Sequence, residues 1–124
     1  MVLIIGGAYQ GKRDYAKNAY HLTEDDIFTC NGTKIDFSKK CIDRLEEFIL
    51  ACVREGIDPE GYLREHEALW GDSILICRDI FCGVVPMDPV IRKWRHTTGL
   101  CCQYLAGQAT RVSRIFCGLE QRLK

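Results

Sequence analysis

With 124 residues, the chain has room for one domain with a single core and little room for a second substrate-binding unit. Lys and Arg together number 17, as do Asp and Glu, so a net charge of zero argues against a nucleic-acid or anionic-membrane partner. The apolar fraction of 47% and the charged fraction of 27% exclude a disordered or fibrous protein.

The first dozen residues predict a strand followed by a phosphate-binding loop. Residues 2–5 are apolar, and residues 6–12 read GGAYQGK, which matches GxxxxGK between a strand and a helix. In such a loop the backbone N–H groups surround phosphate oxygens, and the lysine reaches the outer phosphates. The expected ligand is therefore a nucleoside triphosphate, ATP or GTP. The residues expected to bind it are Gly6, Gly7, Ala8, Tyr9, Gln10, Gly11, Lys12 and Arg13.

Residue 13 departs from the usual motif, in which Ser or Thr places its hydroxyl on Mg²⁺. Arg13 cannot coordinate a cation, so one part of the metal site is missing. One hypothesis is that Arg13 supplies a fixed positive charge in place of part of the lost metal contact. The alternative interpretation of the whole segment is a glycine turn that merely joins a strand to a helix, with Lys12 exposed.

The following segments alternate between helix and strand patterns. A short helix is expected at 12–20 and a strand at 26–30. A long amphipathic helix is expected at 36–55, with Ser38 as a candidate cap and Gly56 as its end. A turn at 58–61 and a helical piece at 62–69 come next.

Residues 73–77 form a continuous apolar run, which is typical of a central parallel strand covered on both faces. Arg78 and Asp79 follow it directly, so an acidic group is expected at the carboxyl edge of the sheet, where open α/β sheets bind ligands. A helix is expected from Asp88 onwards, then a strand at 111–117 and a polar tail at 118–124.

Four strands that alternate with helices predict an α/β fold with crossover connections. We expect a three-layer, P-loop NTPase-like open sheet, mostly parallel, with about four to five strands and helices on both faces. We also expect residues 1–124 to form a single nucleotide-binding domain.

The cysteines, histidines and tryptophans are given structural interpretations. The eight cysteines contain no CxxC pair, and the adjacent Cys101 and Cys102 cannot form an unstrained bridge, so free thiols are expected. Because no secretory signal or membrane-length apolar segment is present, a cytoplasmic location without membrane attachment is predicted. His66 is expected to be a partly exposed helix residue or a hydrogen-bonding residue at the edge of the core, and Trp70 and Trp94 are expected in or beside the core.

Two blocks of the sequence together carry a resemblance to a known family. The first block is residues 6–12, and the second contains Gly83, Val84, Val85, Pro86, Arg92, Trp94, Arg95, Gly99, Gln103, Leu105 and Ala106. They resemble the motifs GGAxSGKS, NExGxGxVP and RxFRDxxGxxNQxxA of the adenosylcobinamide kinase/adenosylcobinamide-phosphate guanylyltransferase family. The two blocks occur in the right order and bracket most of the chain.

The resemblance implies a P-loop enzyme of cobalamin biosynthesis that phosphorylates a cobinamide-like alcohol. Lys12 would then be catalytic together with the loop amides, and Asp79 would be a catalytic carboxylate that holds Mg²⁺ or orients a hydroxyl. The family's guanylylated-histidine segment, RxxxHxxxRxxxWxTxE, is missing after the second expected strand, so guanylyltransferase activity is not expected. The resemblance also implies a homo-oligomer.

Whether the chain is an enzyme stays open at this point. One function is phosphoryl transfer from ATP or GTP to an alcohol. The other is a degenerate, non-catalytic module that binds a nucleotide or a protein partner. A purely structural domain with an empty loop is a third hypothesis. Neither the preferred base nor the phosphoryl acceptor follows from the sequence.

Overall fold

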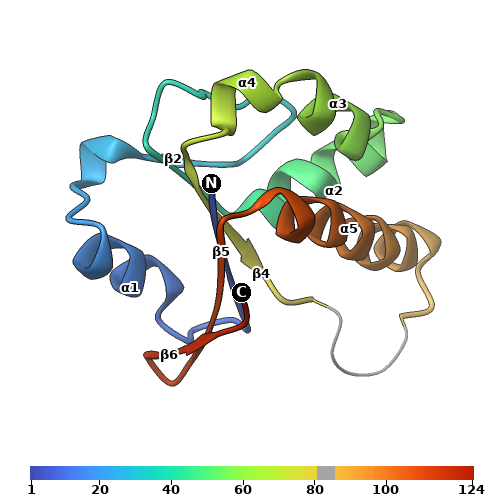
Figure 1. The fold of residues 1–124 in the computed structure, drawn as a ribbon. Coiled ribbons are helices and arrows are strands. Elements are labelled where there is room, and N and C mark those ends of the chain that lie inside the picture. Colours follow the sequence, from blue (N-terminus) through green and yellow to red (C-terminus); the bar gives the residue numbers. More distant parts are fainter. Residues whose placement is uncertain (81–85) are drawn as a thin grey trace.

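The computed structural model describes residues 1–80 and 86–124, and within these ranges the chain forms a six-stranded sheet (Figure 1). The strand order is β2-β3-β4-β1-β5-β6, and all neighbouring strands are parallel except β5 and β6. Cys82, Gly83, Val84 and Val85 lie outside the described residues. The strands are β1 (Val2–Gly6), β2 (Ile27–Thr29), β3 (Cys41–Asp43), β4 (Ile74–Arg78), β5 (Arg111–Phe116) and β6 (Leu119–Arg122).

β1 lies at the centre of the sheet, between β4 and β5. Its successive side chains point to opposite faces, and both faces are covered. Leu3 is packed in one core cluster and Ile4 in the other, and each is at most 1% exposed. This double burial explains the uninterrupted apolar run at the start of the sequence.

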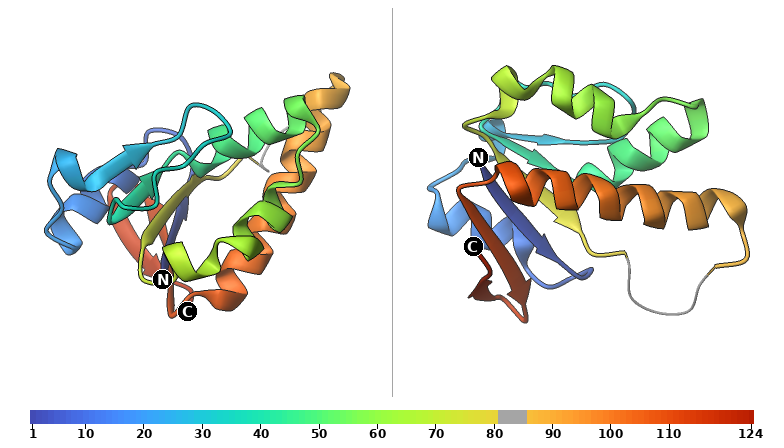
Figure 2. Two further views of the ribbon diagram at one scale, coloured as in Figure 1. Left: turned by 90° about the horizontal axis from the view of Figure 1, so that it is seen from above. Right: turned by 45° about the vertical axis from the view of Figure 1, so that its right-hand side comes forward.

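Helices cover both faces of the sheet, as predicted (Figure 2). Helix α1 (Lys12–Ala19) packs Ala16 against the cluster that contains Ile4 and Ile76. On the opposite face, Phe48 and Leu105 belong to the larger cluster. The helices that contribute to this second layer are α2 (Leu45–Glu55), α3 (Pro59–Glu65), α4 (Glu67–Trp70) and α5 (Pro89–Gln108).

The predicted helix at 36–55 is wrong in its first half, because β3 occupies residues 41–43 and α2 begins only at Leu45. Cys41 and Ile42 are both fully buried, one in each core cluster, as a strand between β2 and β4 requires. Arg44 separates the two elements with a φ of 56°. Ser38 does not cap the helix: its amide and hydroxyl both donate to Asp36 Oδ1.

The predicted polar tail is also wrong, because residues 119–122 form β6. This strand pairs antiparallel with β5 through Cys117 and Gly118, which have φ values of 52° and 75°. Positive φ at both central residues is the geometry of a tight hairpin turn, for which Asn-Gly is the usual signal. The hairpin could not be recognised from the sequence, because Cys-Gly stands in place of Asn-Gly and because every β6 residue is exposed, so the strand has no apolar alternation.

Most of the remaining elements agree closely with the sequence. The predicted segments 12–20, 26–30, 73–77 and 111–117 correspond to α1, β2, β4 and β5 with small shifts at their ends. Gly56 ends α2 with a φ of 71°, as expected for a glycine stop. The turn expected at 58–61 is wrong, because α3 begins at Pro59, and the helical piece expected at 62–69 is divided between α3 and α4. Within residues 1–80 and 86–124, no helix combines the length and apolar character needed to cross a membrane.

Candidate functional site

The loop that joins β1 to α1 lies at the carboxyl end of the central strand, and two of its glycines are structurally required. A Cβ on Gly6 would lie 2.6 Å from the carbonyl oxygen of Ile115, which is closer than atoms can approach. Gly11 has a φ of +90°, a conformation that L side chains rarely adopt. These contacts give a physical reason for both glycines of the motif that does not depend on a ligand.

The β5–β6 hairpin holds this loop in place. Gln10 accepts two hydrogen bonds from the hairpin turn: its carbonyl oxygen from Gly118 N at 2.8 Å and its side-chain Oε1 from Cys117 N at 2.7 Å. The preceding residue, Tyr9, is fully exposed and has a φ of 58°. Cys117, the last residue of the predicted strand, and Gly118, the first residue of the predicted polar tail, therefore support the candidate phosphate loop.

Lys12 folds back over the loop. Its Nζ donates a hydrogen bond to the carbonyl oxygen of Gly7 at 2.6 Å, and the side chain is half-buried. Burial lowers the pKa of Lys12, while the carboxylates of Glu46 and Asp43 act in the opposite direction. An anion bound in the loop would supply a nearby negative charge and would favour the charged lysine.

The loop opens onto a cavity of about 480 Å³. This volume is within the range that small-molecule sites commonly have. Residues 8–14 line one side, and the strand and helix ends contribute Thr29, Asp43, Arg44, Glu46 and Arg78. The wall carries four cationic side chains, Lys12, Arg13, Arg44 and Arg78, against the three acidic side chains of Asp14, Asp43 and Glu46, and this excess of positive charge favours an anionic ligand.

Sheet register brings these strand ends together. Thr29 at the end of β2 pairs with Asp43 at the end of β3, and Gly6 at the end of β1 pairs with Arg78 at the end of β4. Because the four strands are parallel, their carboxyl ends lie on one edge of the sheet. This is the edge at which open α/β sheets bind ligands.

Asp43 is a site residue that sequence reasoning missed, because it lies within the segment predicted as one long helix. It is 6% exposed, and both of its carboxylate oxygens accept hydrogen bonds. Oδ1 accepts from Arg44 N at 2.8 Å and Oδ2 from Arg13 Nη1 at 2.9 Å. The signal available in the sequence was the apolar pair Cys41 and Ile42 followed directly by an acid.

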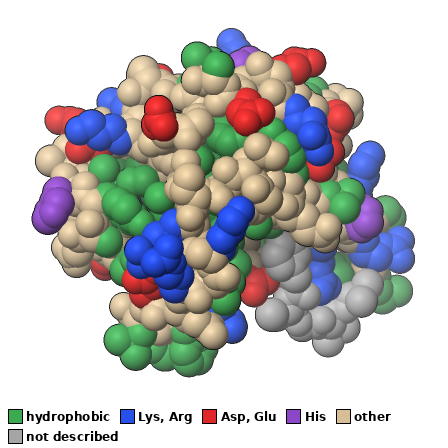
Figure 3. All heavy atoms as spheres, viewed as in Figure 1, with side chains coloured by type: hydrophobic (Ala, Val, Ile, Leu, Met, Phe, Trp, Pro, Cys, Tyr) green, Lys and Arg blue, Asp and Glu red, His purple; other side chains and the backbone are tan. Residues whose placement is uncertain are grey.

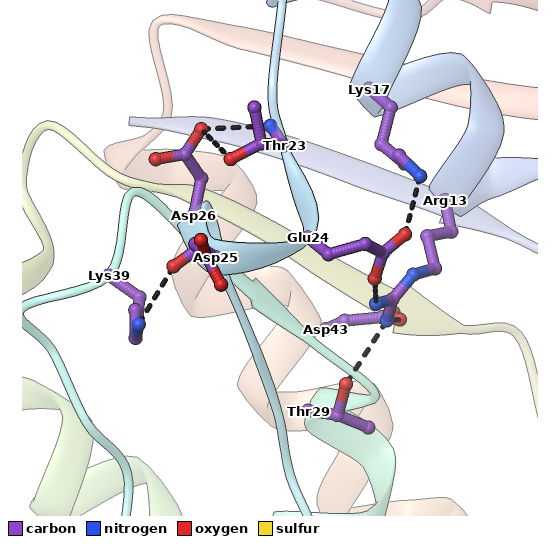
Figure 4. Close-up of polar contacts among 9 residues, drawn as sticks. All are labelled: Arg13, Lys17, Thr23, Glu24, Asp25, Asp26, Thr29, Lys39 and Asp43. Atoms are coloured by element: carbon purple, nitrogen blue, oxygen red, sulfur yellow. Dashed lines mark hydrogen bonds and ion pairs between the residues drawn. The ribbon is translucent and has the colours of Figure 1, made fainter.

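Arg13 extends from the first turn of α1 toward the ends of β2 and β3 (Figure 4). Besides Asp43, its guanidinium donates to Thr29 Oγ1 at 3.1 Å and to the carboxylate of Glu24. Glu24 also pairs with Lys17, one turn further along α1. Arg13 therefore lines the loop cavity, while three neighbouring oxygen groups hold its guanidinium.

Glu46 is a second acidic group that the sequence did not single out. It is 3% exposed, and its Oε1 accepts the backbone N–H of Arg78 at 2.8 Å. Burial raises the pKa of this carboxyl group. Its backbone carbonyl oxygen accepts the Trp94 indole N–H at 2.8 Å, so Trp94 is a core residue, as predicted.

Asp79 does not line the loop cavity. It follows β4, where its backbone N–H donates to Gly6 O at 2.7 Å, and it lines a neighbouring hollow of about 370 Å³. Among the described residues, Ile80 and Arg95 also line this second hollow. The two hollows share Ala8 and Arg78, so Asp79 is adjacent to the loop without facing the same cavity as Lys12.

His66 lies at the edge of the core, as predicted. Its ring stacks on Tyr62 with centroids 4.2 Å apart, and its Nδ1 is 2.7 Å from Tyr62 O. Trp70 is also a core residue, as predicted: it is 1% exposed and its indole N–H donates to Leu63 O. His66 and Trp70 line neither hollow in the described part of the chain.

No protein-family model matches this sequence, and the search of curated proteins found no match. What is established is an α/β protein with a mostly parallel sheet and a glycine loop at the end of its central strand. The resemblance to the cobinamide kinase family stays a prediction that rests on the two sequence blocks.

Proposed function

We propose that this protein binds a nucleoside triphosphate, ATP or GTP, in the cavity next to residues 6–12. The proposal rests on one observation: the glycine loop and a cavity of suitable size lie next to each other. GxxxxGK follows the central strand, Lys12 folds over the loop, and a space of about 480 Å³ opens beside it. The class of protein proposed is therefore P-loop NTPase-like.

The proposed chemistry, if the protein turns over, is phosphoryl transfer from the nucleotide to an alcohol. Lys12 and the loop N–H groups would stabilise negative charge on the transferred phosphoryl group. The adjoining hollow is the candidate place for the alcohol, where Asp79 would orient the attacking hydroxyl. The resemblance to the cobinamide kinase family supports a cobinamide-like alcohol as the acceptor.

A non-catalytic nucleotide-binding module is the second candidate function. The ion pair between Arg13 and Asp43 favours it, because an acid that lines the phosphate cavity is engaged by a cation of the protein itself. In this case the bound nucleotide would stabilise a surface of the protein to which a partner protein binds. Binding without transfer distinguishes this function from the kinase.

Thermal unfolding with ATP and with GTP tests the binding proposal, using Lys12→Met and the exposed-lysine control Lys93→Met. A ligand at one hundred times its Kd should stabilise the native protein by about 2.7 kcal/mol. We expect this stabilisation in the wild type and in Lys93→Met, and at least a tenfold loss of affinity in Lys12→Met, roughly the 1.4 kcal/mol or more of one charged hydrogen bond. Equal stabilisation of all three proteins, or of none, contradicts the proposal.

Turnover is tested separately, by following nucleoside diphosphate formation with cobinamide present and absent. Formation that requires both the alcohol and Lys12 supports the kinase. Nucleotide binding with no diphosphate above the Lys12→Met background supports the non-catalytic module.

A further inference from the structure

This chain differs from P-loop NTPases at the position where those proteins hold Mg²⁺. In P-loop NTPases, Mg²⁺ is held between the hydroxyl that follows the loop lysine and an acid from a neighbouring strand. The residue after Lys12 is Arg13, and the acid at a strand end beside the loop cavity is Asp43. These two side chains contact each other directly, with 2.9 Å between Arg13 Nη1 and Asp43 Oδ2.

The described residues do not fit Mg²⁺ at this position. Magnesium requires oxygen ligands at about 2.0–2.1 Å in octahedral geometry, and a guanidinium has no lone pair to offer. Both carboxylate oxygens of Asp43 already accept N–H donors, from Arg13 and from Arg44. In the part of the chain that the structure describes, no group of three or more His, Cys, Asp or Glu side chains is arranged to hold a metal ion.

We propose that the Arg13 guanidinium, held in place by Asp43, substitutes for this metal ion. The cavity then takes the metal-free polyphosphate chain of a nucleoside triphosphate in preference to its magnesium complex. This inference rests on the proposed function, since it specifies which form of the triphosphate the same loop binds.

The contacts of Arg13 support this role. Of the five N–H donors of a guanidinium, contacts within the described residues engage two on Nη1 and one on Nη2. The Nε–H and the second Nη2–H have no protein partner in these contacts and are the donors for phosphate oxygens. Asp43 is 6% exposed and therefore works as a rigid anchor for the guanidinium. Arg–phosphate pairs are charge-assisted and frequently bidentate.

Charge balance favours the same form of the ligand. Four cationic and three acidic side chains line the cavity, which leaves one positive charge in excess, and the metal-free triphosphate is more negative than its magnesium complex by the charge of the ion. A bound Mg²⁺ would instead lie beside a fixed guanidinium, and the two cations would repel each other. Added magnesium is therefore expected to compete with the protein for the triphosphate.

Isothermal titration calorimetry with inorganic tripolyphosphate and with ATP tests the inference. Each ligand is titrated into the wild-type protein once in excess EDTA and once in excess Mg²⁺. We expect at least about tenfold tighter binding in EDTA, the size of one charge-assisted contact. Tripolyphosphate removes any contribution from the base, so its preference reports on the phosphate site alone.

Variants of Arg13 test whether this residue causes the preference for the metal-free triphosphate. Arg13→Ser restores a hydroxyl after Lys12 and should abolish or reverse the preference for the metal-free ligand. Arg13→Lys keeps the charge without the planar fork and should retain part of it. Arg92→Ser removes an exposed arginine on α5 and should behave as the wild type. Circular dichroism checks folding, and Arg13→Lys carries the test if Arg13→Ser does not fold.

The outcomes separate the two proposals. Tighter binding of the magnesium complex by the wild type overturns the inference and leaves the proposed function standing. An unchanged preference in a folded Arg13 variant also overturns the inference, because the preference then comes from other residues. Absence of binding in both EDTA and Mg²⁺ overturns the proposed function itself.

Discussion

Individual backbone positions determine the shape of the candidate loop. Gly6 approaches the backbone of β5 so closely that any side chain would collide with it, while Gly11 adopts a left-handed conformation. Tyr9 and Arg44 are non-glycine residues with φ near +57°, at 58° and 56°. Such conformations cost free energy and are kept only when surrounding contacts determine them. Both residues line the loop cavity.

Gly6→Ala should destabilise the protein by roughly 1–3 kcal/mol, because the new Cβ would lie 2.6 Å from the carbonyl oxygen of Ile115 and the sheet must shift. Gly32→Ala is the matched control: a Cβ there meets nothing within 4 Å, and its φ is outside the left-handed region. The control should change stability by about 0.5 kcal/mol or less. Urea unfolding of both variants measures the difference, and equal midpoints would refute the steric role of Gly6.

At the loop the sequence was informative because the relevant residues are contiguous. The glycines and Lys12 were recognised from spacing alone. The support that Gln10 receives from Cys117 and Gly118 was not, because these residues are more than one hundred positions away in the chain. Contacts of this kind depend on sheet order, which local patterns do not encode.

The β5–β6 hairpin shows how one element stabilises another that carries the site. Its turn holds Gln10, and a polar cluster joins its two strands. Glu120 on β6 pairs with Arg111 on β5 and accepts from Ser113 Oγ at 2.7 Å. Hydrogen bonds from Arg111, then Ser113 and Tyr15, lower the pKa of Glu120 to about 2. Because Tyr15 is on α1, the cluster also links the hairpin to the helix that follows the loop.

Glu120→Gln should remove an acid-sensitive part of the stability. A carboxyl group whose folded-state pKa is depressed contributes stability above its unfolded value of 4.5, and that contribution is lost as the pH falls toward 2. The wild type should therefore exceed the variant at pH 7 by up to about 1 kcal/mol, the range of surface pairs, and the two should converge near pH 2.

Urea unfolding between pH 2 and 7 measures this difference. Glu65→Gln, at an exposed position on α3, is the control and should follow the wild-type curve. A constant offset between Glu120→Gln and the wild type across this pH range would show that the carboxylate charge has no part in the effect.

The elements that were misread from sequence share one physical cause. β3 and β6 have weak local signals, and each is a strand because of the neighbours it pairs with. The apolar positions of β3 happened to continue the helical spacing of α2, so Ile42, Leu45 and Ile49 suggested one helix face. Strand propensity depends strongly on context, and tertiary pairing overrides it. The long apolar strands β1 and β4 were predicted correctly because burial on both faces shows directly in their composition.

Across the whole molecule, acidic and basic side chains are mixed at the surface, and the reactivity of each cysteine thiol depends on its burial. On the face drawn in Figure 3, acidic and basic side chains are interspersed, in keeping with a net charge of zero. The seven described cysteines are free thiols; Cys30, Cys41, Cys52, Cys77 and Cys101 are buried, Cys102 is intermediate and Cys117 is exposed. Burial raises the pKa of Cys41 and Cys101 to about 12. Cys41 and Cys101 are therefore packing residues rather than nucleophiles at neutral pH.

Brief alkylation with iodoacetamide at pH 8 should modify Cys117 first among the seven described cysteines, because it is exposed. Peptide mapping by mass spectrometry identifies each site, so labelling at other positions does not obscure the result. Cys41 and Cys101 should react only after denaturation. Early labelling of either residue in the folded protein would contradict its burial.

The loop motif, the central apolar strands and the α/β class could be deduced from the chain alone, because contiguous residues carry those signals. The position of Asp43 against Arg13 could not, since it requires a three-residue strand to pair between β2 and β4 and bring its end to the loop. The same holds for the hairpin behind Gln10. Local spacing specifies which groups are available, whereas long-range strand pairing specifies which of them meet.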